Sequence, residues 1–141
     1  MGVRARASLL REVHFKILAT GARMGVHSRS MPKYVILFGV NPETLSRFIE
    51  RPEDRRGPVN AIAQAVGGKL ESYYWMFGQY DGLAIFDLPD SESAAAAALA
   101  AASSGAFRHV ETHELIEADN LVRVLERAKQ ARPSYRPPGG A

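Results

Sequence analysis

The chain carries an unbroken apolar run, Tyr34-Val35-Ile36-Leu37-Phe38-Gly39-Val40, which Asn41-Pro42-Glu43 follows at once. Seven residues are too few for a buried helix and most of them favour β-structure, so the run predicts a buried central strand. Asn41 is a preferred N-cap residue and Pro42 suits the first position of a helix. We therefore expect a strand that leads directly into a helix.

The segment after Pro42 has apolar residues at helical spacing, but proline interrupts it. Pro52 and Gly57-Pro58 break the pattern, which predicts two helical pieces instead of one. Gly67-Gly68 is typical of a helix C-cap and ends the second piece.

Strands and helices alternate along the remainder of the chain. Asp90 and Asp119 each precede a helical pattern as an N-cap, and residues 132–141 are too rich in proline and glycine to pack. The expected elements are a strand over Lys69–Phe77, a strand over Leu83–Leu88, a helix from Asp90 to Ser104, a strand over Phe107–Glu117 and a last helix from Asp119 to Gln130.

This order, βαββαβ, predicts an α+β fold of the ferredoxin-like type with a four-stranded antiparallel sheet and an extra C-terminal helix. The strands over residues 34–40 and 83–88 are apolar on both faces, as central strands are, whereas the other two carry more charge, as edge strands do. Helices of this topology cover one face of the sheet. We expect a second copy of the chain to cover the other face, which gives a homodimeric α/β barrel.

Several short motifs occur in a distinctive order along this body. They are Gly67-Gly68-Lys69, Tyr73-Tyr74-Trp75, Gly78-Gln79-Tyr80-Asp81, Pro89-Asp90 before the alanine-rich helix, and Glu111-Thr112 in the last strand. In this order they resemble the GYD domain family from about Pro32 to Glu117. The resemblance implies a small dimeric α/β-barrel protein whose biochemical role is not established.

Charge divides the chain into a basic leader and a mildly acidic body. Residues 1–30 hold six basic side chains and one acidic side chain, and residues 31–141 hold twelve and fourteen. The leader is either untranslated, with a start at Met31, or a targeting segment, or a flexible arm.

We expect the folded domain over 31–131 and a disordered tail over 132–141. A body without a basic patch predicts no nucleic-acid partner.

Two short stretches, residues 73–75 and residues 78–81, supply the first candidate site residues. Tyr74 and Trp75 alternate faces of their strand and suit either core packing or an aromatic wall for a small ligand. Asp81 suits either a turn-stabilising acceptor or a partly desolvated general base, and Tyr80 beside it would orient a substrate.

His109, Glu111 and His113 occupy alternate positions of the last strand and so face one side of the sheet. One neighbouring pair is within reach of a metal ion, but a polar face of an edge strand is the favoured interpretation, and we predict no metal site. The chain has no cysteine and no phosphate-binding glycine loop before a helix, so no cofactor is expected either.

Two classes of function stay open at this point. The favoured one is a homodimeric binding or sensing module that holds a small apolar or aromatic molecule between sheet and helices, with Tyr74, Trp75, Tyr80, Asp81 and Glu111 as its ligand-binding residues. The alternative is a cofactor-independent monooxygenase or isomerase acting on an aromatic or quinoid substrate, with Asp81, Tyr80 or His109 as catalytic candidates. No apolar run approaches the ~20 residues that span a bilayer, so we expect a cytoplasmic protein without a membrane partner.

Overall fold

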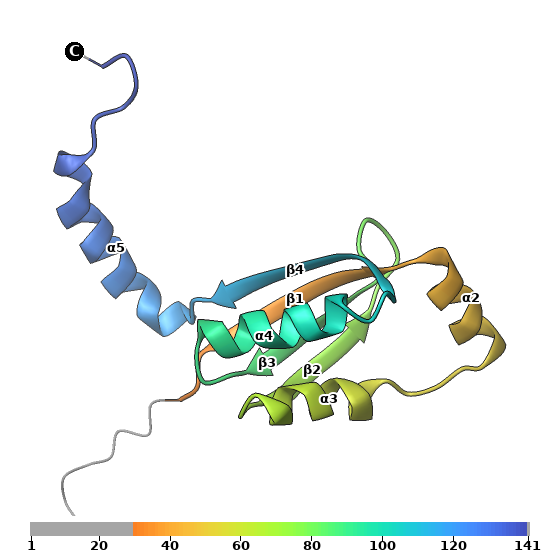
Figure 1. The fold of residues 1–141 in the computed structure, drawn as a ribbon. Coiled ribbons are helices and arrows are strands. Elements are labelled where there is room, and N and C mark those ends of the chain that lie inside the picture. Colours follow the sequence, from red (N-terminus) through yellow and green to blue (C-terminus); the bar gives the residue numbers. More distant parts are fainter. Residues whose placement is uncertain (1–29, 141) are drawn as a thin grey trace, which may run out of the picture. The chain divides into compact units, whose positions relative to one another are not determined.

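The computed structural model describes residues 30–140, and the predictions about the basic leader lie outside the described residues except at Ser30. The chain has the predicted βαββαβ order with a C-terminal helix (Figure 1). Its elements are β1 (Lys33–Val40), α2 (Pro42–Glu50), α3 (Arg56–Ala65), β2 (Lys69–Trp75), β3 (Gly82–Asp87), α4 (Ser91–Ala102), β4 (Phe107–Leu115), the 3₁₀ turn η1 (Ala118–Asn120), α5 (Leu121–Ala131) and the 3₁₀ turn η2 (Arg132–Ser134).

The four strands form one antiparallel sheet in the order β2-β3-β1-β4. The two strands with two apolar faces are therefore central and the two charged strands are edges, as predicted. Opposite residues of an antiparallel pair point to the same side. The pairing of Leu37 with Leu83 places both on one face, and the pairing of Ile36 with Ala84 places both on the other.

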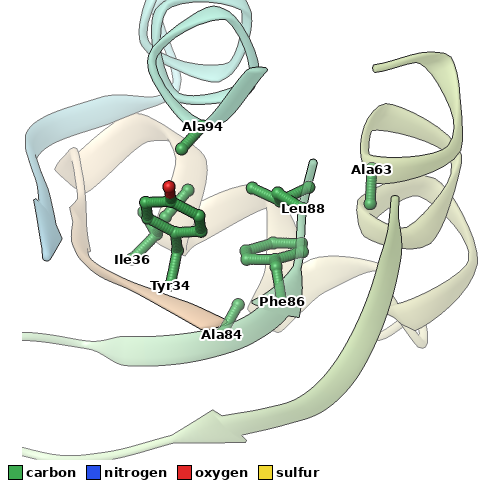
Figure 2. Close-up of a cluster of buried hydrophobic side chains, with 7 residues drawn as sticks. All are labelled: Tyr34, Ile36, Ala63, Ala84, Phe86, Leu88 and Ala94. Atoms are coloured by element: carbon green, nitrogen blue, oxygen red, sulfur yellow. The ribbon is translucent and has the colours of Figure 1, made fainter. Parts of the chain in front are cut away.

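Helices α3 and α4 lie on one face of the sheet (Figure 1), which we call the helix face. The other face, called the open face, carries Val35, Leu37, Leu83 and Ile85, all of them half-buried. Figure 2 shows strand side chains directed toward single alanines of the two helices, an arrangement that lets helix and sheet approach closely. The core cluster consists of Tyr34, Ile36, Ala63, Ala84, Phe86, Leu88 and Ala94.

The predicted caps are present at three helix ends. The Asn41 side chain accepts a hydrogen bond from the Thr44 amide at 2.9 Å, and the Asp90 side chain accepts one from Ser93 at 2.7 Å. Gly67 has φ of +87°, the left-handed conformation that glycine adopts without strain, and it ends α3.

Element ends differ from the predictions in several places. β2 ends at Trp75 instead of Phe77, because the Met76 amide turns back to the Asp81 carbonyl at 2.9 Å and closes the hairpin. The strand predicted to reach Glu117 ends at Leu115, and the helix predicted to reach Ser104 ends at Ala102. The last helix begins at Leu121 without a side-chain cap, because Asp119 lies in η1.

Helix α5 packs mainly against the short turns on either side of it. All its side chains are exposed, including Leu121, Val124 and Leu125. The tail predicted to be disordered includes the η2 turn over Arg132–Ser134. Within residues 30–140, every helix is too short or too polar to cross a membrane.

Candidate functional site

A cavity of about 280 Å³ lies between the helix face of the sheet and helices α2, α3 and α4. Its walls are apolar, and Pro58, Trp75 and Ser104 at its edge are exposed, so it opens to solvent. Six aromatic residues line it, and among five of them neighbouring ring centroids lie 5.5–6.0 Å apart. These five are Phe38, Phe48, Tyr73, Trp75 and Phe107, and the sixth is Phe86.

Four polar side chains line the same cavity, and they differ in accessibility: Thr44, Arg55, Tyr73 and Ser104. Thr44 is buried, and its Oγ1 atom is covered and without a hydrogen-bond partner among residues 30–140. Arg55 is half-buried at the start of α3. Burial raises the pKa of the Tyr73 hydroxyl to about 12, so this hydroxyl is a neutral donor at physiological pH. The polar groups that are at least partly accessible are therefore Arg55, Tyr73 and Ser104, and the Ser104 hydroxyl already donates to the Ala101 carbonyl at 2.7 Å.

A second polar cluster forms on the open face around Glu111. Its Oε2 accepts from the Tyr80 hydroxyl at 2.6 Å and lies 3.2 Å from His109 Nε2, while its Oε1 lies 2.6 Å from His113 Nε2. The rings of Tyr80 and His109 lie 5.8 Å apart. The alternation of β4 thus brings three predicted polar residues to one side, and the loop after β2 adds the tyrosine.

These contacts define the protonation states of the cluster. The hydrogen bond from Tyr80, followed by those from His113 and His109, holds the pKa of Glu111 at about 2. The same hydrogen bond raises the pKa of Tyr80. Glu111 therefore stays ionised and Tyr80 stays protonated at neutral pH, a stable pairing in which neither group is poised for proton transfer. No group of three histidine, aspartate or glutamate side chains in the described part of the chain has the geometry of a metal site.

Asp81 stabilises the junction between the hairpin and β1. Its Oδ2 accepts from the Val40 amide at 2.8 Å and lies 3.4 Å from Arg108 Nη2. Its own amide donates to the Phe38 carbonyl at 2.8 Å. The acceptor role predicted for Asp81 is present, but the main donor is a strand amide far away in the sequence and not a turn amide.

We expect Asp81→Ala to lower the free energy of unfolding by about 1–3 kcal/mol, the usual cost of leaving a buried donor such as the Val40 amide unpaired. Asp81→Asn keeps an acceptor and should lose less. Chemical denaturation of the three proteins measures both effects. An Asp81→Ala variant at least as stable as the parent would show that the carboxylate opposes folding, as a strained catalytic group does.

The lowered pKa of Glu111 predicts a specific pH dependence of stability. The ionised carboxylate stabilises the fold above pH 4.5, and that contribution is lost as the pH falls toward about 2. Tyr80→Phe removes the largest cause of the shift, so this variant should lose less stability than the parent over that interval. Thermal unfolding at several pH values tests this, with Tyr74→Phe, an exposed tyrosine, as the control. Parallel curves for the parent and Tyr80→Phe would refute the prediction.

The five residues predicted to bind a ligand do not form one site. Trp75 pairs with Gly82 and lines the cavity, whereas Tyr74 pairs with Leu83 and lies on the open face with Tyr80 and Glu111. The catalytic candidates Asp81, Tyr80 and His109 are likewise absent from the cavity wall in residues 30–140. Tyr74 and Trp75 lie on different faces because successive strand residues point to opposite faces of a sheet.

Several residues that line the cavity were not among the predicted site residues: Phe38, Thr44, Phe48, Arg55 and Phe107. They come from β1, α2, the start of α3 and β4. Phe48 is one of the apolar residues at helical spacing after Pro42, and strand alternation places Phe38 on the same side as Ile36. Nothing in the local pattern indicated that these inner faces leave a space between them.

Comparison with known proteins gives a family match over most of this domain. The family model named GYD domain matches residues 34–125. The crystal structure titled MtbAldR is similar at 13% sequence identity and a TM-score of 0.41, over 78% of this chain and 74% of that chain. A likeness of that degree carries no information about ligand or function. No curated protein has a sequence match to this chain.

Proposed function

We propose that this chain, which belongs to the GYD domain family, acts as a homodimeric module that binds a small aromatic or apolar molecule. The cavity on the helix face carries this proposal. An apolar cavity of about 150 Å³ accommodates benzene, so about 280 Å³ has room for a second fused ring. Ligand sites are typically concave and apolar with few polar groups, and this cavity fits that description.

The positions of the candidate bases support binding without chemistry. A general base has to be within hydrogen-bond reach of its substrate, directly or through one water molecule. Asp81 and His109 are not among the described residues that line the cavity. Asp81 is engaged with Val40 and Arg108, and His109 faces Glu111. The cavity therefore offers a place to bind an aromatic molecule but none of the predicted catalytic groups.

Two features favour a second copy of the chain as the partner. The open face presents four half-buried aliphatic side chains next to the exposed Tyr74 and Leu115. The chain is also complementary to itself in charge. Residues 31–120 carry seven basic and thirteen acidic side chains, whereas residues 121–141 carry five and one. A two-fold pairing would bury both apolar faces and bring the basic α5 of one copy near the acidic body of the other.

Binding is tested with two fused-ring probes of nearly equal shape, naphthoate and naphthamide. The chain has a single tryptophan, and it lines the cavity, so the indole N–H signal of Trp75 in NMR spectra reports occupancy without ambiguity. We expect at least one probe to shift this signal in a saturable manner. Calorimetry on the same samples provides the dissociation constants.

A cavity-filling variant locates the binding site. Ala97 of α4 is buried and lines the cavity, so Ala97→Phe should reduce probe affinity by at least about tenfold, since the added ring occupies the ligand's space. Ala96→Phe on the same helix, at an exposed position, should bind as the parent does. Ala101→Phe is a second filling variant should Ala97→Phe fail to fold. Failure of both probes to bind the parent, or equal binding by a folded filling variant, would contradict the proposed function.

A further inference from the structure

The cavity that we propose as the ligand site has a one-sided charge. Of the described residues that line it, Arg55 alone is charged, and the wall contains no carboxylate. The remaining wall is aliphatic and aromatic apart from the hydroxyls of Thr44, Tyr73 and Ser104 and the indole of Trp75. An apolar space with a cation at its edge favours a ligand that is apolar over most of its surface and negatively charged at one end.

Arg55 has donors available for such a ligand. Its side chain is 36% exposed, and among residues 30–140 the structure records one hydrogen bond from it, from Nη1 to Glu53 Oε1 at 2.8 Å. A guanidinium group has five N–H donors in a planar fork that matches a carboxylate. Glu53 is 53% exposed, so solvent weakens its attraction for Arg55.

Tyr73 supplies a second donor to the same cavity. Its ring stacks on Phe38 with centroids 5.9 Å apart, which fixes the hydroxyl relative to the cavity wall. Tyr73 and Arg55 both line the cavity, so the hydroxyl-bearing ring and the guanidinium group border the same space. A neutral hydroxyl and a guanidinium group in the wall of one cavity are suitable donors for an anionic head group.

We propose that the cavity selects planar aromatic carboxylates, with the rings among the aromatic side chains and the carboxylate directed toward Arg55 and the Tyr73 hydroxyl. The inference rests on the proposed function and adds the class of ligand. A monoanion fits better than a phosphate dianion, because a single cation, already paired with Glu53, faces the cavity.

The paired probes test this selectivity directly, because naphthoate and naphthamide differ in charge and hardly in shape. We expect the parent to bind naphthoate at least about tenfold more tightly than naphthamide. Arg55→Met keeps an apolar stem of similar reach and should remove the preference while naphthamide affinity stays within about threefold, which also shows that the cavity is intact.

Arg56→Met is the matched control. Arg56 is adjacent, carries the same charge, is paired with Asp54 at 2.6 Å and is absent from the described cavity wall, so its loss should leave the preference unchanged. Tyr73→Phe should weaken naphthoate more than naphthamide. Equal affinity of the parent for the two probes, or an equal loss of preference in Arg56→Met, would overturn the inference and leave the proposed function standing. Absence of binding by both probes would overturn both.

Discussion

Leu83→Lys is expected to convert the proposed homodimer into monomers at micromolar protein concentration. Leu83 lies on a central strand of the open face, between Leu37 and Tyr74. A two-fold interface contains every substitution twice, so this change places two like charges in the apolar contact. Each buried unpaired charge costs several kcal/mol, which corresponds to an increase of about a thousandfold or more in the dissociation constant.

Sedimentation equilibrium measures the expected change, with the parent at twice the mass of one chain. Leu99→Lys is the matched control: it makes the same substitution at a residue of α4 that is 69% exposed, and it should remain dimeric. Circular dichroism should show that both variants are folded. A parent protein that is monomeric at this concentration would contradict the dimer. Helix α5 could not account for such a monomer by covering the open face, because its apolar residues are exposed.

Leu88→Ala is expected to lower the free energy of unfolding by about 2–5 kcal/mol, the range for removing a fully buried leucine. Leu88 has 0% exposure and is the largest side chain that is fully buried among the described residues. Its amide also donates to the Pro32 carbonyl at 3.1 Å, so the backbone is held in place and collapse around a smaller side chain is restricted. A small domain has about 5–15 kcal/mol of stability, so this is a large fraction.

Urea unfolding at one fixed protein concentration provides the measurement, since the proposed dimerisation would make apparent stability depend on concentration. The midpoint should fall while the slope is unchanged. Leu99→Ala on the exposed side of α4 should change stability by less than about 0.5 kcal/mol. Equal effects of the two substitutions would show that Leu88 is not part of the cooperative core.

Local chemistry determined the elements of this fold and their roles in the sheet. Asn41 and Asp90 were identifiable as caps because a cap depends on the three or four residues that follow it. Central and edge strands were distinguishable because burial on two faces removes charge from a strand. Strand alternation likewise placed His109, Glu111 and His113 on one side, and the two histidines do face Glu111.

Contacts between distant segments decided the sites, and local patterns do not encode them. Trp75 and Tyr80 are only five residues apart in the sequence but lie on opposite faces of the sheet. Trp75 therefore lines the cavity, whereas Tyr80 contacts Glu111. Arg55 lies between α2 and α3, where no periodic pattern applies, and yet it lines the cavity. A periodic pattern specifies which side of a helix turns inward. Only the tertiary structure decides whether the inward side chains meet or leave a space, because that depends on the summed volumes of residues far apart in the chain.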